Sequence, residues 1–275
     1  MVLVVVDNDP AGSARVVVAQ FAATAPFQVY YVHEPRRGIA RARNAAVDRA
    51  LELGADWIAM LDDDETADRR WLANLMVEEY RHIPVLMGHR IWVYPEPRPF
   101  WAPDGLRKTA IEGAKARHHS TSNVRFSAEL LHAGLRFDEG LGLAGGEDQR
   151  FFDDAAGSGF AIHATNRALT YEAAHRERLT YRFMIARHYG HIASVAFRRR
   201  QDAGVAALLR ALPMRLLDVP LGIVELAISP IARLFGRRRF KQFALRGGKR
   251  VAGVVGTIAA SLGHLPQSYR RIAGR

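Results

Sequence analysis

Residues 57–65 read Trp-Ile-Ala-Met-Leu-Asp-Asp-Asp-Glu, a short apolar run followed at once by four acids. The apolar run is typical of a buried strand, and strand and helix patterns alternate on both sides of it. Strands are predicted at 2–6, 28–32 and 85–93, and helices at 13–23, 39–53 and 69–81. This alternation predicts an α/β fold with a mostly parallel sheet flanked by helices. Ligands of such sheets bind beyond the carboxyl ends of the strands, where these acids lie.

The composition divides the chain into two electrostatic parts. The 275 residues carry a formal net charge of +11 and contain no cysteine, which excludes disulfide scaffolds, thiolate metal sites and cysteine nucleophiles. Residues 176–275 hold 20 Lys and Arg against four acids, so residues 1–175 have a net negative charge. We therefore expect an acidic α/β domain over 1–175, whose carboxylates suit a metal site, and a basic helical region over 176–275, which suits phosphate, a lipid surface or nucleic acid.

Two carboxylate clusters are candidates for chemistry. Asp62, Asp63 and Asp64 follow a strand directly, and hard oxygen ligands without histidine or thiolate favour Mg²⁺ or Mn²⁺ bound together with substrate phosphates. Glu147 and Asp148 follow a glycine-rich turn at a helix start, where an ionised carboxylate serves as a general base. The alternatives are a solvated acidic loop for the first cluster and helix-capping acids for the second.

Two further segments complete the candidate site. Asp7 and Asp9 follow the first strand, at the same edge of the predicted sheet as the aspartates at 62–64. Residues 38–44, Gly-Ile-Ala-Arg-Ala-Arg-Asn, open a helix with small residues, and its free amides with Arg43 favour an anion site. A surface role for the arginines is the alternative.

Taken in order, these motifs resemble the family 2 glycosyltransferases with the GT-A fold. The resemblance covers about residues 1–200 and is strongest to bacterial enzymes that extend exopolysaccharide repeat units, of the succinoglycan glucosyltransferase kind. It includes residues 122–124, Ser-Asn-Val, besides the segments above. It implies an inverting, metal-dependent transfer of one sugar from a nucleotide-diphosphate sugar, with UDP as the expected nucleotide, to a lipid-linked or polysaccharide acceptor.

The resemblance also implies a role for each residue. Asp148 matches the family's catalytic base, with Glu147 beside it on the acceptor side. Asp64 matches the metal ligand and Asp62 an acid near ribose and metal. The other positions expected to contact the nucleotide sugar are Asp7, Asp9, Arg43 and Asp63.

The sequence departs from the family pattern in two respects. The usual first strand and helix, which line the nucleotide pocket, are not recognised before residue 2, so an inactive relative that only binds nucleotide sugar or glycan is an alternative. A Gln-x-x-Arg-Trp motif is not found after the base, which argues for single-sugar addition and against a processive synthase.

The basic region predicts where the protein acts. Arginine triplets at 198–200 and 237–239 flank an apolar stretch at 216–235 that prolines and acids interrupt, a pattern that favours helices lying in a membrane interface. We expect a peripheral or monotopic protein on an anionic membrane surface at the cytoplasmic face. The alternative is a soluble helical appendage packed on the sheet domain. Nucleic-acid binding is the rival use of this charge, but no recognition motif supports it, so no nucleic-acid partner is expected.

Overall fold

The computed structural model describes residues 1–103, 111–116, 119–141 and 145–264. These residues form two compact units. The first comprises 1–93, 111–116, 119–141 and 147–173, and the second comprises 94–103, 145–146 and 174–264. The sequence placed the boundary two residues further on, at 175/176, and it did not place the proline-rich loop at 94–103 with the C-terminal helices.

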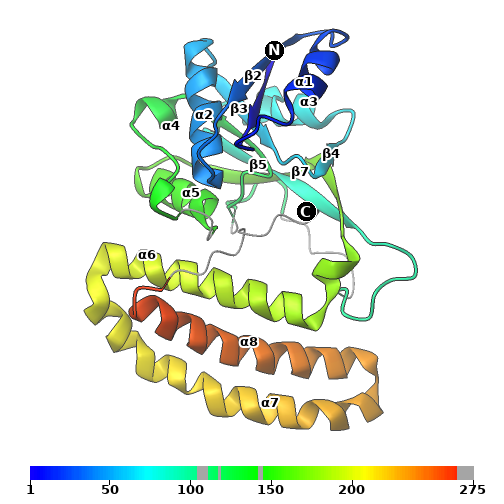
Figure 1. Ribbon diagram of the computed structural model, residues 1–275, viewed down its shortest axis with the longest axis vertical. Coiled ribbons are helices and arrows are strands. Elements are labelled where there is room, and N and C mark those ends of the chain that lie inside the picture. The colour runs from blue at the N-terminus through cyan, green and yellow to red at the C-terminus, as the bar shows by residue number, and fades with distance from the viewer. Residues whose placement is uncertain (104–110, 117–118, 142–144, 265–275) are drawn as a thin grey trace. The chain divides into compact units, whose positions relative to one another are not determined.

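The first unit is an α/β structure, as predicted (Figure 1). Its strands are β1 (Val2–Asp7), β2 (Gln28–His33), β3 (Trp57–Leu61), β4 (Glu65–Ala67), β5 (Val85–Val93), β6 (Asn123–Ser127) and β7 (Ile162–Ala173). Its helices are α1 (Arg15–Ala22), α2 (Ile39–Glu52), α3 (Trp71–Leu75), α4 (Glu129–His132) and α5 (Glu147–Gly157), with 3-10 turns η1 (Glu78–Tyr80) and η2 (Glu139–Leu141).

The strands form two sheets. β1 and β2 make a parallel pair, and the other five strands follow the order β3-β6-β5-β7-β4. In the larger sheet β5 and β7 are parallel, whereas β6 is antiparallel to both β3 and β5, and β4 is antiparallel to β7. β3 and β5 run in the same direction, as the strand–helix alternation predicts, but β6 lies between them. No helix separates β6 from β5 in the described part of the chain, and an antiparallel partner requires no crossover helix.

Helices cover both faces of the larger sheet. The main apolar core joins α2, α4 and α5 to one face, with Phe126, Phe137, Phe151 and Phe152 almost fully buried at its centre. On the other face Leu75 and Trp71 of α3 pack with Leu86 of β5. β5 contributes to both cores because successive residues of a strand point to opposite faces.

The predicted helix at 69–81 is correct only over Trp71–Leu75. The chain leaves the helical conformation after Met76, is extended at Val77 and forms η1. The fully buried Arg125 explains the break, because its Nη2 donates hydrogen bonds to the carbonyl oxygens of Tyr80 (3.0 Å) and Ile83 (2.6 Å). Burial lowers the pKa of this arginine to about 10.

Gly88 leaves the space that Asn123 occupies, at the irregularity where β5 shifts register against β7. Asn123 Oδ1 accepts a hydrogen bond from Trp71 Nε1 (2.9 Å), and its Nδ2 donates to the carbonyl of Ala168 (3.0 Å). A Cβ at residue 88 would collide with the Asn123 amide. We expect Gly88→Ala to lower the free energy of unfolding by about 2 kcal/mol, measured by urea denaturation.

Gly157→Ala is the matched control for that substitution. A Cβ at this helical position meets nothing within 4 Å, so alanine is expected to leave stability unchanged or raise it by a few tenths of a kcal/mol. Equal stability of the two variants would contradict the proposed packing of Asn123.

The second unit is helical. It contains η3 (Arg176–Leu179), α6 (Tyr181–Leu216), α7 (Asp218–Ala232), η4 (Arg233–Phe235) and α8 (Arg237–Ser261). α6 is two helices joined at Gly204, whose φ of 76° lies in the left-handed region that favours glycine. α8 lies between α6 and α7 (Figure 1). In the described part of the chain, no helix is long and apolar enough to cross a membrane.

The proline-rich loop is fixed within this second unit. The aromatic rings of Phe100 and Trp101 contact those of Tyr181 and Phe240. Buried Lys241 donates a hydrogen bond to the carbonyl of Ala102 (2.9 Å).

Candidate active site

Asp7 is buried at the end of β1 and organises the turn that follows. Its carboxylate accepts hydrogen bonds from the backbone amides of Asp9 (3.0 Å) and Ala14 (2.8 Å) and from the Tyr31 hydroxyl (2.9 Å). Burial raises the pKa of this carboxyl, but the three hydrogen bonds outweigh burial and the net pKa is lowered. Asp7 and Asp9 therefore belong to one hydrogen-bonded turn between β1 and α1.

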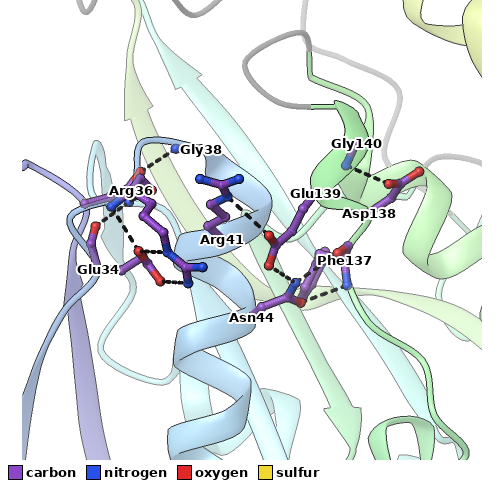
Figure 2. Close-up of polar contacts among 10 residues, drawn as sticks. Glu34, Arg36, Gly38, Arg41, Asn44, Phe137, Asp138, Glu139 and Gly140 are labelled. Carbon is purple, nitrogen blue, oxygen red and sulfur yellow. Dashed lines mark hydrogen bonds and ion pairs between the residues drawn. The ribbon is translucent and has the colours of Figure 1, made fainter.

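The next residue, Asn8, joins this turn to the start of α2. Its Oδ1 accepts a hydrogen bond from the Gly38 amide (2.9 Å), and its Nδ2 donates to the carbonyls of Glu34 (2.7 Å) and Arg36 (2.9 Å). A hydrogen-bonded ion pair to Arg36 lowers the pKa of Glu34 to about 2 (Figure 2). Gly38 has a φ of 154°, which favours glycine, so the loop turns sharply into α2 where the sequence predicts.

Residues of the first turns of α2 hold the segment that leads toward α5. Asn44 Nδ2 donates to the Phe137 carbonyl (3.0 Å) while the Phe137 amide donates to Asn44 Oδ1 (2.9 Å). Arg41 Nε donates to Glu139 Oε2 (3.2 Å), as Figure 2 shows. These contacts fix 137–139 against α2. Residues 142–144 of the predicted glycine-rich turn lie outside the described residues.

Arg43 joins the two predicted carboxylate clusters. Its Nη1 donates to Glu147 Oε1 at the start of α5, and its Nη2 lies 3.7 Å from Asp62 Oδ1 at the end of β3. The Arg43 side chain is 17% exposed and that of Glu147 only 5%. The Arg43 guanidinium thus compensates the charges of two carboxylates, one of which is buried. Removing either partner of the buried Arg43–Glu147 pair would leave an uncompensated charge and destabilise the fold.

The acids of the two clusters are close enough to influence one another. Burial raises the pKa of Asp62, Arg43 opposes this effect, and Asp64 and Asp148 raise the pKa further. Burial likewise raises the pKa of Glu147, against the effect of Arg43 and with an added contribution from Asp148. Asp62 and Glu147 therefore flank Arg43, Asp64 and Asp148 are close enough for their charges to act on them, and Asp63 and Asp64 are exposed.

Glu147 and Asp148 differ in what they can do chemically. Glu147 is buried and bound to Arg43. Asp148 is partly exposed at the first turn of α5, its Oδ1 accepts only a local hydrogen bond from the Gln149 amide (2.7 Å), and it forms no ion pair with the described residues. The partial positive charge of a helix N-terminus stabilises an ionised carboxylate there. Asp148 is thus the more accessible of the two carboxylates at the start of α5.

The donor set fits a hard divalent cation that a substrate helps to bind. No group of three or more His, Cys, Asp or Glu residues among the described ones is arranged to hold a metal on its own. Asp64 and Asp62 would supply one or two carboxylates to such an ion, and Mg²⁺ and Mn²⁺ take their remaining ligands from water and substrate phosphates. A bound cation would reduce the electrostatic repulsion between the Asp62 and Asp64 carboxylates.

Sequence reasoning missed a second charged group at this site. Arg90 of β5 lies 2.7 Å from Glu172 Oε2 and 3.4 Å from Glu65 Oε1, and both carboxylates are buried. Arg90 also lowers the pKa of Asp62, so its charge acts on the acidic site. Glu172 lies opposite Glu65 in the β4–β7 ladder, and Arg90 is on the adjacent strand. No local sequence pattern signals this group, because it depends on strand pairing.

Comparison with known proteins agrees with the class that these motifs indicate. Residues 2–133 match the family model described as glycosyl transferase family 2. Residues 2–133 therefore form a family 2 glycosyltransferase domain, and the predicted resemblance is confirmed. This defines the enzyme class of the domain.

The chain is also similar to named proteins. It is 32% identical over 194 residues to the succinoglycan biosynthesis protein ExoM of Rhizobium meliloti (strain 1021). The aligned region covers 68% of this chain and 61% of ExoM. The chain thus spans less than two thirds of that relative. The crystal structure of S. aureus TarS 1-349 is 17% identical with a TM-score of 0.48, covering 99% of this chain and 85% of that one. The same protein in complex with UDP has a TM-score of 0.46 at the same identity and coverage.

Proposed function

We propose that the protein transfers a single sugar from a nucleotide-diphosphate sugar, expected to be a UDP-sugar, to a hydroxyl group of a lipid-linked or polysaccharide acceptor. The observation that carries the proposal is the acidic site around Arg43, in which one carboxylate is accessible while its neighbour is buried and paired. The succinoglycan biosynthesis named for ExoM supports a polysaccharide product. We place the reaction in exopolysaccharide or cell-surface synthesis at the cytoplasmic face of the membrane.

Each residue has a role in the proposed reaction. The acceptor oxygen attacks the anomeric carbon as the bond from that carbon to the diphosphate breaks, and Asp148 takes the hydroxyl proton. A single displacement of this kind inverts the anomeric configuration. Asp64, with Asp62, would hold Mg²⁺ or Mn²⁺, which when bound neutralises the charge of the leaving diphosphate. Arg43 keeps Asp62 and Glu147 in place. Asp7, Asp9 and Asp63 would contact the nucleotide sugar.

A donor panel tests this function. The purified chain is incubated with UDP-, GDP- and TDP-sugars in Mn²⁺, Mg²⁺ or EDTA, and the released nucleotide diphosphate is measured. We expect UDP to be released from a UDP-sugar only when a divalent ion is present. Asp64→Ala is expected to lower the rate of this release by at least about 100-fold. Asp48→Asn is the control. Asp48 is an exposed acid of α2 that pairs with Arg136, and its replacement is expected to keep wild-type activity.

The panel also has outcomes that overturn the proposal. Full activity in EDTA, or in Asp64→Ala, would exclude the proposed metal role. Binding of UDP-sugar by a folded chain without release or transfer would favour the alternative of an inactive nucleotide-sugar-binding relative.

A further inference from the structure

Helix α7 is apolar on the side that faces away from its unit. Every exposed residue of the helix is apolar. Leu221, Ile223, Val224 and Ile231 each expose more than half of their surface, and Leu234 and Phe235 of η4 continue the row at 84% and 67%. We call this row the α7 face: Pro220, Leu221, Ile223, Val224, Ala227, Ile228, Pro230, Ile231, Leu234 and Phe235. Contiguous apolar surface of this extent marks an interaction site.

The polar side chains of α7 point the other way, toward α8. Asp218 and Glu225 both form ion pairs with Arg250, the latter at 3.1 Å, and Glu225 also lies 3.4 Å from Arg246. Ser229 is buried on the same side. An ordinary surface helix buries its apolar stripe and exposes its charges, and α7 does the opposite.

Packing against α8 fixes α7 in this orientation. Gly222 of α7 and Gly247 of α8 meet so closely that a Cβ on either would lie 2.9 Å or less from the other's carbonyl oxygen. On its opposite side α8 packs Gly256 against the backbone of Tyr189 in α6. Figure 1 shows α7 running beside α8. The glycine contact and the ion pairs fix α7 against α8 with its apolar side exposed.

Positive charge borders the α7 face at both ends. The exposed arginines there are Arg210 and Arg215 before α7 and Arg233, Arg237, Arg238 and Arg239 after it. The acids of α7, Asp218 and Glu225, are already in ion pairs with arginines of α8. Each Lys or Arg near an anionic lipid surface contributes about 1 kcal/mol to binding.

We propose that the α7 face docks on an anionic lipid bilayer, with α7 lying in the plane of the interface. The apolar side chains enter the boundary between headgroups and acyl chains, and the arginines at both ends contact lipid phosphates. A second copy of the chain fits the face less well. A two-fold contact would bring the same six arginines of each copy together, and in the described part of the chain only Arg215 of the six forms an ion pair, with Asp218 (3.9 Å).

Vesicle flotation with the full chain tests the proposal. We expect binding to vesicles of equimolar phosphatidylcholine and phosphatidylglycerol, and much weaker binding to phosphatidylcholine alone. The double substitution Ile223→Glu with Ile231→Glu is expected to weaken binding at least about tenfold. Both side chains are more than half exposed, so the variant should melt at the wild-type temperature.

The control also introduces two glutamates in place of exposed apolar residues, but on another helix. Val16→Glu with Val17→Glu changes two α1 residues that are 64% and 66% exposed, and it should leave binding unchanged. Equal binding of wild type and the α7 variant, or an equal loss in the α1 variant, would overturn the proposal. A wild-type dimer in light scattering that the α7 variant dissociates would assign the face to a second copy instead.

A fluorescence measurement gives an independent readout. Phe235→Trp adds a tryptophan at an exposed position of the α7 face. We expect vesicles with brominated acyl chains to quench this variant more than the wild-type chain, which has four tryptophans elsewhere. Equal quenching of the two proteins would contradict insertion of the face.

Discussion

Asp148→Asn is expected to lower kcat for sugar transfer by about 1,000-fold while the KM for the donor stays within a few-fold of wild type. Asparagine keeps the size of the side chain but accepts no proton, so only the proton transfer is lost. Asp148 is partly exposed and forms no ion pair with the described residues, so its replacement should leave the melting temperature unchanged. Steady-state kinetics with the best UDP-sugar of the donor panel, at saturating metal, measure the effect.

Two variants of the same helix make this result specific. Asp154→Asn removes an exposed acid paired with Arg150 and should keep wild-type kcat. Glu147→Gln removes the buried partner of Arg43, so it should lower stability as well as activity. If Asp148→Asn keeps more than a tenth of wild-type kcat while Glu147→Gln loses nearly all of it at unchanged stability, the base is Glu147 and the assignment is wrong.

The carboxylate clusters were predictable because their signals are local. An apolar run followed by Asp62, Asp63 and Asp64 marks a strand end within nine residues, and β3 ends at Leu61. Gly38 marks the start of α2 in the same way, and the helix begins at Ile39. Sequence reasoning also placed Glu147 and Asp148 at a helix start, where α5 begins.

The connections between these segments were not predictable. Arg43 and Glu147 are 104 residues apart, and no periodicity relates them. The group of Arg90, Glu65 and Glu172 depends on the order of β5, β7 and β4, and sequence reasoning did not predict β4 or β7 at all. Which strands pair depends on the packing of the whole sheet, and a local sequence pattern does not predict it.

The apolar stretch at 216–235 shows a different limit. In the sequence Asp218 and Glu225 interrupt it. In the structure both acids lie on the inner side of α7, beside Arg250 of α8, and the outer side is continuous. That the region lies in a membrane interface stays a prediction. Which side is apolar depended on the position of α8.

Arg43→Met is expected to reduce the free energy of unfolding by about 3–5 kcal/mol at pH 7. Methionine fills a similar volume but leaves Glu147 buried with no cation beside it. Urea denaturation of the two proteins, followed by circular dichroism, measures the difference. The control is Arg41→Met, on the same helix as Arg43. It breaks a half-exposed ion pair with Glu139 and should lower the free energy of unfolding by less than about 1 kcal/mol.

The loss in Arg43→Met should depend on pH in a defined direction. Burial already raises the pKa of Glu147 and Arg43 opposes this, so its removal raises the pKa further. A carboxyl whose pKa is higher in the folded than in the unfolded chain lowers stability most at a pH above its folded-state pKa, and this loss shrinks as the pH falls toward the unfolded-state pKa. The deficit of the variant should therefore shrink as the pH falls toward about 4.3, where glutamate of the unfolded chain also becomes protonated.

The double variant Arg43→Met with Glu147→Gln separates the charge from the packing. Without a carboxylate at position 147 no buried charge remains unpaired, so the double variant should regain most of the stability that Arg43→Met loses. It should stay inactive, because Asp62 has also lost the cation beside it. A double variant no more stable than Arg43→Met would mean that Arg43 supports the fold through its contact with Phe137 and not through Glu147.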